Sequence, residues 1–333
     1  MILAPYTTFR IGGPARYFCE VGSVDDLKIA LQFSKENNLH IFVLGSGSNI
    51  LVSDKGFDGL VIKMDIKGLE FKDGSDCTIL SVGAGEDWDG VVAAAIERNL
   101  GGIENLSWVP GSVGGAVHQN IGCYGTELKE VLEWADVLDC RTNEIHRFTN
   151  KDCCFDYHES VFLSNAGKFV ILQAGIRLSK NSTAKIIYPD LVKYFKDSSE
   201  EPDLKKVRTA LAEIRRAKGT KHEPGGKIGS AGSFFRNPVV GREHYDKLIL
   251  KHDDLKGFSL ENNLVKLSSA QLIEKCGWKG KTCGDVGVSE KHSLVLVNYG
   301  KGTAEEITGL AEDIKMSVKN EFGVELESEV EVI

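Results

Sequence analysis

The chain has 333 residues, a length that allows two or three domains of roughly 100–150 residues each. Its formal net charge of −8 argues against general attraction to nucleic acid or to an anionic membrane surface, so an anionic ligand needs a local arrangement of donors. No apolar run is long enough to span a bilayer, and the first residues lack the basic start and apolar stretch of a signal peptide. We therefore expect a cytoplasmic protein without nucleic-acid or membrane partners.

The eight cysteines do not form the pattern of a disulfide framework. Cys153 and Cys154 are adjacent, the other six are scattered, and no pair of CxxC motifs is present. We therefore expect reduced thiols, as in a cytoplasm, and no zinc site or other metal site.

In chain order, the first elements are short strands separated by glycine turns, with two helices among them. Apolar residues at helical spacing predict helices over 25–38 and 88–98. Short apolar runs predict strands over 41–44, 50–53, 59–64, 68–71 and 78–82.

The rest of the chain mixes strands and helices. We expect a hairpin over 132–148, a strand over 169–178, a helix ending near 217, helices over 268–276 and 304–321, and a strand over 294–298. The polar stretch 197–206 is the best candidate for a domain boundary. The fold class predicted from this order is α+β, with a strand-rich first part and a smaller second domain.

The loop Gly45-Ser46-Gly47-Ser48-Asn49 lies between two predicted strands. A dinucleotide fingerprint would open a helix at this point, whereas an apolar strand follows here. Small residues also let consecutive backbone N–H groups converge on phosphate oxygens, and Ser48 and Asn49 can add side-chain donors. A tight hairpin turn is the plainer alternative, and the loop by itself does not decide between the two.

The segment Pro110–Gly125 is also rich in glycine, and its sequence is PGSVGGAVHQNIGCYG. Repeated glycines indicate backbone that approaches a flat or bulky group closely. Two such segments in one strand-rich half favour a large cofactor with phosphates, such as a flavin with a diphosphate tail.

Several motifs along the whole chain resemble the MurB family of flavin-dependent enoyl reductases, within the vanillyl-alcohol-oxidase-type superfamily. They are Thr7–Gly13, Gly45–Asn49, Pro110–Gly125, Gly229–Pro238 (GSAGSFFRNP) and the ending Leu326–Val330 (LESEV). The GSFFRNP run is the most specific of them. The ending has serine where the family has proline.

The resemblance implies a two-lobed FAD-binding domain of the vanillyl-alcohol-oxidase/PCMH type and a smaller α+β substrate-binding domain. The implied division is 1–64 for the first lobe, 65–215 for the second lobe with a tyrosine-loop insertion, 216–320 for the substrate domain and 321–333 for a returning strand. The implied reaction is the NADPH-dependent reduction of UDP-N-acetylglucosamine enolpyruvate to UDP-N-acetylmuramate through FAD, catalysed by a monomer. The tyrosine segment around Tyr188 resembles that of type I members.

The family's catalytic residues correspond to Ser233, Glu329 and His158. Hydride addition to the enolpyruvyl alkene leaves negative charge beside its carboxylate, so the site needs an acid and a cation or donor. The resemblance assigns the acid to Ser233, although a serine between glycine and two phenylalanines is usually structural. Glu329 fits beside a substrate carboxylate only if it is protonated or orients a cation.

His158 stands where the family has arginine, in Phe155–Phe162 (FDYHESVF). Arginine is permanently charged, whereas histidine is charged only below a pKa near roughly 6.5. We expect activity that survives and falls on the alkaline side. The alternative is that another cation compensates.

The remaining site residues follow from the resemblance. The residues implied for FAD are Gly45, Ser46, Gly47, Ser48, Asn49, Ile50, Val109, Ser112, Val113, Gly114, Asn120, Gly122, Ile171 and Arg215. The residues implied for the substrate are Tyr124, Tyr188, Lys218, Asn237, Lys266 and His292.

Two other functions remain open. A different flavin oxidoreductase of the superfamily would share the glycine loops, but it has no reason to carry the GSFFRN run. A catalytically impaired binder of nucleotide sugars or flavin is supported only by His158.

Overall fold

Helices and strands both run through the described part of the chain, residues 1–156, 159–198, 201–219 and 228–333 of a computed structural model. This composition confirms the α+β prediction. The backbone packs into two units: the first contains residues 1, 15–46 and 58–216, and the second contains residues 2–14, 47–57 and 217–333. Among the described residues, no helix is long and apolar enough to cross a membrane.

The first unit begins with a three-stranded sheet in the order β1-β4-β2. Its strands and the adjoining helix are β1 (Ala15–Val21), β2 (His40–Leu44), β4 (Phe57–Met64) and α1 (Val24–Glu36). The Ser23 hydroxyl caps α1 by accepting the Asp26 N–H, and Leu27 and Leu31 form part of its buried stripe. β2 and β4 pair in parallel, with His40 opposite Gly59.

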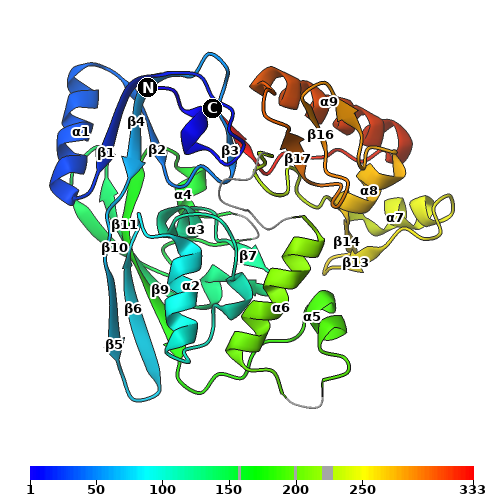
Figure 1. Cartoon of the computed structure of the whole chain (residues 1–333), viewed down its shortest axis with the longest axis horizontal. Coiled ribbons are helices and arrows are strands. Elements are labelled where there is room, and N and C mark those ends of the chain that lie inside the picture. The colour runs from blue at the N-terminus through cyan, green and yellow to red at the C-terminus, as the bar shows by residue number, and fades with distance from the viewer. Residues whose placement is uncertain (157–158, 199–200, 220–227) are drawn as a thin grey trace. The chain divides into compact units, whose positions relative to one another are not determined.

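The first unit also contains a five-stranded antiparallel sheet (Figure 1), in the order β10-β9-β11-β6-β5. Its strands are β5 (Leu69–Asp73), β6 (Cys77–Gly83), β9 (Leu132–Asp139), β10 (Ile145–Thr149) and β11 (Phe169–Ser179). The predicted hairpin over 132–148 is confirmed as β9 and β10, with Ile145 opposite Leu138. Trp88, Val91 and Val92 from α2 share one buried core with Leu80 and Val82 from β6.

Short elements complete the first unit. They are α2 (Trp88–Glu97), η2 (Glu104–Leu106), α3 (Val113–His118), β7 (Gly122–Cys123), β8 (Thr126–Glu127), η3 (Leu128–Glu130), α4 (Val161–Ser164), α5 (Pro189–Tyr194) and α6 (Leu204–Ala217). The polar stretch 197–206 does not separate the units, because α6 packs into the first one. Val207, Ala210 and Leu211 of α6 form a buried cluster with Tyr124 and Leu191, and the chain enters the second unit after residue 216.

The described residues of the second unit form small sheets and the helices α7, α8 and α9. Its elements are η1 (Ala4–Tyr6), β3 (Ile50–Leu51), β12 (Val239–Gly241), α7 (Arg242–Ile249), β13 (Gly257–Ser259), β14 (Leu264–Leu267), α8 (Ser269–Lys275), β15 (Thr282–Cys283), β16 (Val286–Val288), β17 (Leu296–Asn298), α9 (Ala304–Phe322) and β18 (Glu331–Val332). α9 starts at a capping box between Thr303 and Glu306 and ends at Gly323, whose φ is 62°. The parallel pair β3–β18 joins the segment after the first glycine loop to the end of the chain.

Candidate active site

Ser233 lies in an extended segment of the second unit that other chain segments hold on both sides. It forms an antiparallel bridge with Val295, and the N–H of Phe234 donates to the Leu294 carbonyl at 2.8 Å. Phe234 and Phe235 are buried, with ring centroids 5.1 Å apart. Gly232 has a φ of +73°, and a Cβ there would meet nothing within 4 Å. Ser233, itself half-buried, is therefore held by a fixed backbone beside open space.

Glu329 lies on the other edge of the same segment. Its N–H donates to the Phe234 carbonyl at 2.8 Å, and the neighbouring Ser328 bridges Phe235. The Asn49 amide donates to the Glu329 carbonyl at 3.1 Å. Burial raises the pKa of the Glu329 carboxyl to about 7, and the attraction of Arg236 opposes this rise. The structure therefore brings two predicted catalytic residues onto paired segments, and near neutral pH the carboxyl is partly protonated.

Arg236 is a residue of this site that the sequence analysis did not assign. Its N–H donates to the Glu327 carbonyl at 2.9 Å, and its charge acts on Glu329. Arg236 belongs to the same GSFFRNP run as Ser233. The available signal was a cation in the same short motif as the candidate Ser233, but its carboxyl partner comes from the end of the chain and is brought to it by folding.

Two substrate candidates of the second unit, Asn237 and His292, adjoin the segments that pair at Ser233. The Asn237 Oδ1 accepts the Ser269 N–H at 3.0 Å, which fixes the orientation of the amide. Lys266 pairs with Val239 on β12 and with Phe258 on β13. His292 Nδ1 accepts the Leu294 N–H at 3.3 Å, and so it lies next to the segment that pairs with Ser233. Lys218 follows α6 and is half-buried.

The loop Gly45–Asn49 is not a hairpin turn, so that alternative is wrong. β2 before it pairs with β4, and β3 after it pairs with β18, so the loop connects strands of different sheets. Within the described residues, no hydrogen bond is donated by a backbone N–H of this loop. The carbonyl of Gly47 accepts from the Thr8 N–H at 3.0 Å, and Gly47 has a φ of +61°. Consecutive N–H groups without an acceptor in the described part of the chain suit an anionic ligand.

The second glycine segment differs from the first, because its N–H groups bond within the protein. Val113 donates to Glu86, Gly114 donates to Ala84, and Gly115 donates to the Ser112 hydroxyl at 3.3 Å. A Cβ at Gly114 would lie 3.1 Å from the Ala84 Cβ, so glycine allows α3 to approach the end of β6. A Cβ at Gly45 would lie 2.4 Å from Ser112 Oγ, and so the two predicted cofactor segments meet in the first unit.

Other predicted cofactor residues have structural partners of their own. The Asn120 amide donates to Glu127 at 3.0 Å and to the Asp156 carbonyl at 3.1 Å, and its oxygen accepts the Lys129 N–H. Gly122 is exposed in β7, and Ile171 is buried in β11 beside a bulge. Asn120 therefore shapes the turn that precedes Gly122.

An ion pair braces the chain immediately before Val109. Trp108 has the left-handed φ of 63°, and its N–H donates to Asp89 at 2.6 Å. Arg208 binds the same carboxylate through two hydrogen bonds of 2.6 and 2.8 Å, and its guanidinium lies 4.3 Å from the Trp108 ring centroid. This brace fixes the start of the second glycine segment on α2 and α6. The sequence does not reveal this arrangement, because its three residues are far apart in the chain.

Tyr124 and Tyr188, both substrate candidates, are brought together in the first unit. Their ring centroids lie 5.2 Å apart, edge to face. Burial raises the pKa of both phenols. Arg215, in the last turn of α6, is buried and points Nη1 at the Cys123 sulfur at 3.7 Å. Tyr124, Tyr188 and Arg215 therefore lie together around the turn that carries Tyr124.

His158 lies outside the described residues, so the structure gives no position for the predicted third catalytic residue. Its motif neighbour Ser160 is described. The Ser160 hydroxyl donates to the His118 carbonyl and accepts from the start of α4.

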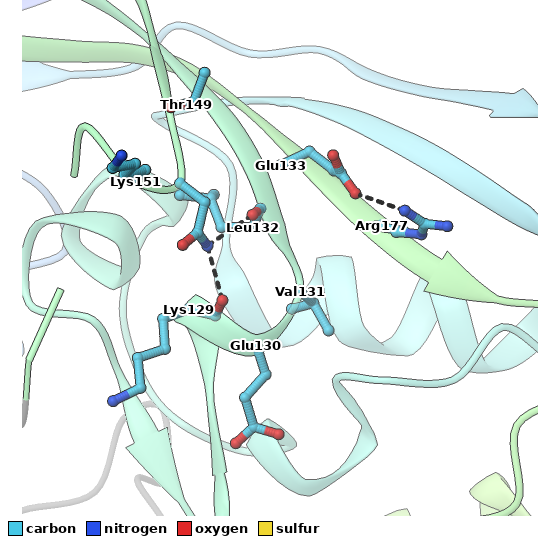
Figure 2. A pocket seen from close by; sticks show the side chains of 9 residues that line it. Lys129, Glu130, Val131, Leu132, Glu133, Thr149, Lys151 and Arg177 are labelled. Atoms are coloured by element: carbon cyan, nitrogen blue, oxygen red, sulfur yellow. Dashed lines mark hydrogen bonds and ion pairs between the residues drawn. The ribbon is translucent and has the colours of Figure 1, made fainter. Parts of the chain in front are cut away.

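A surface hollow of about 470 Å³ lies elsewhere on the first unit (Figure 2). Its lining contains no predicted site residue. Two of its charged side chains, Glu133 and Arg177, pair with each other at 3.2 Å. Charged side chains that already pair on an open surface do not make a catalytic site. The motif residues therefore define the candidate active site.

Comparison with known proteins supports this choice. The C-terminal-domain profile of UDP-N-acetylenolpyruvoylglucosamine reductase matches residues 223–333, and an FAD-binding-domain profile matches residues 15–149. A UDP-N-acetylenolpyruvoylglucosamine reductase from Flavobacterium johnsoniae is 38% identical over 99% of this chain and 98% of its own length. The chain belongs to this reductase family, known as MurB.

Other MurB proteins agree with this assignment. The reductase from Amoebophilus asiaticus is 40% identical over 99% of this chain and 97% of its own length. The crystal structure of MurB from Thermus caldophilus superimposes with a TM-score of 0.69 at 25% identity, covering 100% of this chain and 97% of that one. The family requires FAD. The FAD-binding-domain match fits this cofactor, and so do the N–H groups of Gly45–Asn49, which have no acceptor among the described residues.

Proposed function

We propose that this protein reduces UDP-N-acetylglucosamine enolpyruvate to UDP-N-acetylmuramate in the synthesis of peptidoglycan precursors. NADPH is the reductant, FAD is the cofactor, and the enzyme acts in the cytoplasm as a monomer. The observation that carries the proposal is the pairing of the segments of Ser233 and Glu329 within a MurB-family chain.

FAD, when bound and reduced, supplies the hydride that adds to the terminal alkene carbon of the substrate. Ser233 then donates its hydroxyl proton to the adjacent carbon, where negative charge develops. The rigid pairing of the Ser233 backbone and the open space beside Gly232 support this role. A serine hydroxyl is a weak acid, but the enolate that it protonates is strongly basic.

Glu329 and Arg236 act at the substrate carboxylate. With a pKa of about 7, Glu329 carries a proton in part of the molecules at neutral pH and can donate it to a carboxylate oxygen. Arg236 supplies positive charge on the same pair of segments. These two groups stabilise the charge that develops beside the new C–H bond.

The remaining candidates bind the two large ligands. The loop Gly45–Asn49 provides backbone donors for the FAD diphosphate, together with the segment from Val109 to Gly122, Ile171 and Arg215. Tyr124 and Tyr188 contact the substrate, with Lys218, Asn237, Lys266 and His292 directed at its UDP part.

The test is a purification followed by two optical measurements. We expect a yellow protein with a flavin spectrum, and oxidation of NADPH that depends on UDP-N-acetylglucosamine enolpyruvate. A flavin spectrum without such turnover would indicate a different substrate or an impaired binder. A protein that cannot take up FAD would contradict the proposal altogether.

Replacing His158 with arginine should change the pH dependence of this activity. If His158 supplies a catalytic cation, it loses its charge above a pKa near roughly 6.5, and the wild-type rate falls at alkaline pH. Arginine stays charged, so the variant should regain rate at about pH 8 to 9. Initial rates from about pH 6 to 9 measure this. A flat wild-type profile over that range would show that His158 has no such role.

A further inference from the structure

Asn105 is a fully buried residue of η2 whose side chain joins the two segments that carry the tyrosine pair. Its Nδ2 donates to the Tyr124 carbonyl at 3.1 Å and to the Lys185 carbonyl at 2.8 Å. Lys185 lies three residues before Tyr188. One amide group therefore ties the turn of Tyr124 to the segment of Tyr188.

The Asn105 amide acts here only as a donor. Among the described residues, its Oδ1 has no hydrogen-bond partner, although the side chain is buried. Buried polar atoms are nearly always paired, so leaving this oxygen unpaired is unfavourable. Aspartate and leucine have a similar volume but offer no N–H to two carbonyls. The position therefore requires the two protons of a carboxamide.

The turn that Asn105 holds has an unfavourable backbone. Tyr124 has a φ of 48° and Gly125 a φ of 80°, the left-handed pair of a tight hairpin between β7 and β8. A tyrosine in this conformation is strained and needs support from its surroundings. The hydrogen bond from Asn105 to the Tyr124 carbonyl provides such support. Glu104 adds a second link between η2 and the segment of Tyr188, because it accepts the Lys185 N–H at 3.4 Å.

We propose that Asn105 is a positioning residue for substrate binding, which sets the contact between Tyr124 and Tyr188 without touching the substrate. This inference rests on the proposed function for the substrate roles of the two tyrosines. The structural role of Asn105 does not depend on the proposed function, because the amide holds residues 184–188 against the turn of Tyr124 whichever ligand binds there.

The test compares Asn105→Ala with a matched control, Asn150→Ala. Asn150 also donates to two backbone carbonyls of the first unit, those of Lys129 at 2.7 Å and Leu132 at 2.9 Å, but it does not hold a tyrosine. We expect Asn105→Ala to raise the KM for the enolpyruvate substrate about tenfold, the effect of losing one to two hydrogen bonds, while kcat changes much less. Hydrogen exchange of peptides spanning 184–195 should become faster. Asn150→Ala should change neither quantity.

A second variant, Asn105→Asp, keeps the volume of the side chain. Two facing carbonyls disfavour the ionised carboxylate and raise its pKa, and the protonated acid can donate one hydrogen bond again. Its KM defect relative to wild type should therefore shrink as the pH falls. A role in packing alone predicts a defect that does not depend on pH.

The outcomes separate this inference from the proposed function. Unchanged KM and exchange in folded Asn105→Ala would overturn the inference, and so would an equal KM increase in Asn150→Ala. Suppose that hydrogen exchange is faster in Asn105→Ala but that the wild-type protein does not use the enolpyruvate substrate. That result would support the role of Asn105 in holding the two segments together and would contradict the proposed function.

Discussion

Replacing Ser233 with alanine should lower the rate of substrate reduction by about 100- to 10,000-fold, the usual contribution of a positioned general acid. The fold should be retained, because Ser233 is anchored through its backbone bridge to Val295, which alanine keeps. NADPH should still bleach the flavin absorbance, since that reaction does not require the serine proton. Stopped-flow absorbance with and without the enolpyruvate substrate separates the two reactions.

Two further variants test whether the loss of rate is specific to the Ser233 hydroxyl. Ser230→Ala alters another half-buried serine of the same motif, and it should leave turnover close to wild type. Ser233→Cys keeps an acidic proton at the same position and should retain more activity than Ser233→Ala. A Ser233→Ala enzyme that turns over within a fewfold of wild type would assign the proton to another group.

Replacing Glu329 with glutamine should remove an alkaline fall in activity centred near pH 7. Burial raises the pKa of Glu329 from 4.5 to about 7, so the carboxyl is protonated below pH 7 and ionised above it. If the protonated form is required, the wild-type rate falls about tenfold for each pH unit above this value. Glutamine is neutral at every pH and keeps a donor, so the variant should have a flatter profile.

The Glu329 prediction has its own control and must be separated from the effect of His158. Glu327→Gln removes an exposed carboxylate from the same chain segment, and its pH profile should match wild type. His158→Arg should remove only the part of the alkaline fall in rate that the histidine causes. The pH–rate profile of the double variant should therefore be flatter than that of either single variant. If Glu329→Gln keeps the full alkaline fall, Glu329 is not the group that titrates.

The same pKa shift has a consequence for stability. Because the pKa of Glu329 is higher in the folded protein than the ordinary 4.5, the folded state holds the proton more tightly. This contribution to stability is complete below about pH 4.5 and is lost as the pH rises through about 7. An ionised Glu329 therefore destabilises the fold at alkaline pH, a cost that is expected for the catalytic role proposed for this residue.

The sequence by itself determined the secondary structure well, because the local pattern carries most of that information. The helix predicted over 88–98 is α2 at Trp88–Glu97, and the helix predicted over 304–321 is α9 at Ala304–Phe322. Both have apolar stripes at helical spacing. The α+β class and the family followed from the order of these elements and from the GSFFRNP run.

Pairing between distant segments was beyond the sequence and was decided by the tertiary structure. The loop Gly45–Asn49 permitted a hairpin or a phosphate site, and only the pairing of β3 with β18 excluded the hairpin. The polar stretch 197–206 suggested a boundary, but α6 buries its apolar face in the first unit. Local composition does not reveal which surface an amphipathic helix covers.

The same reason explains why the sequence pointed to Ser233 and Glu329 as candidates but not to the residues that contact their segments. A motif marks a residue by its neighbours along the chain. The partners of Arg236, Asn105 and Asp89 lie from 19 to 119 residues away in the chain, and no local pattern connects them. Their charges and hydrogen bonds acquire a role only when folding brings those partners within bonding distance, because these interactions fall off steeply beyond it.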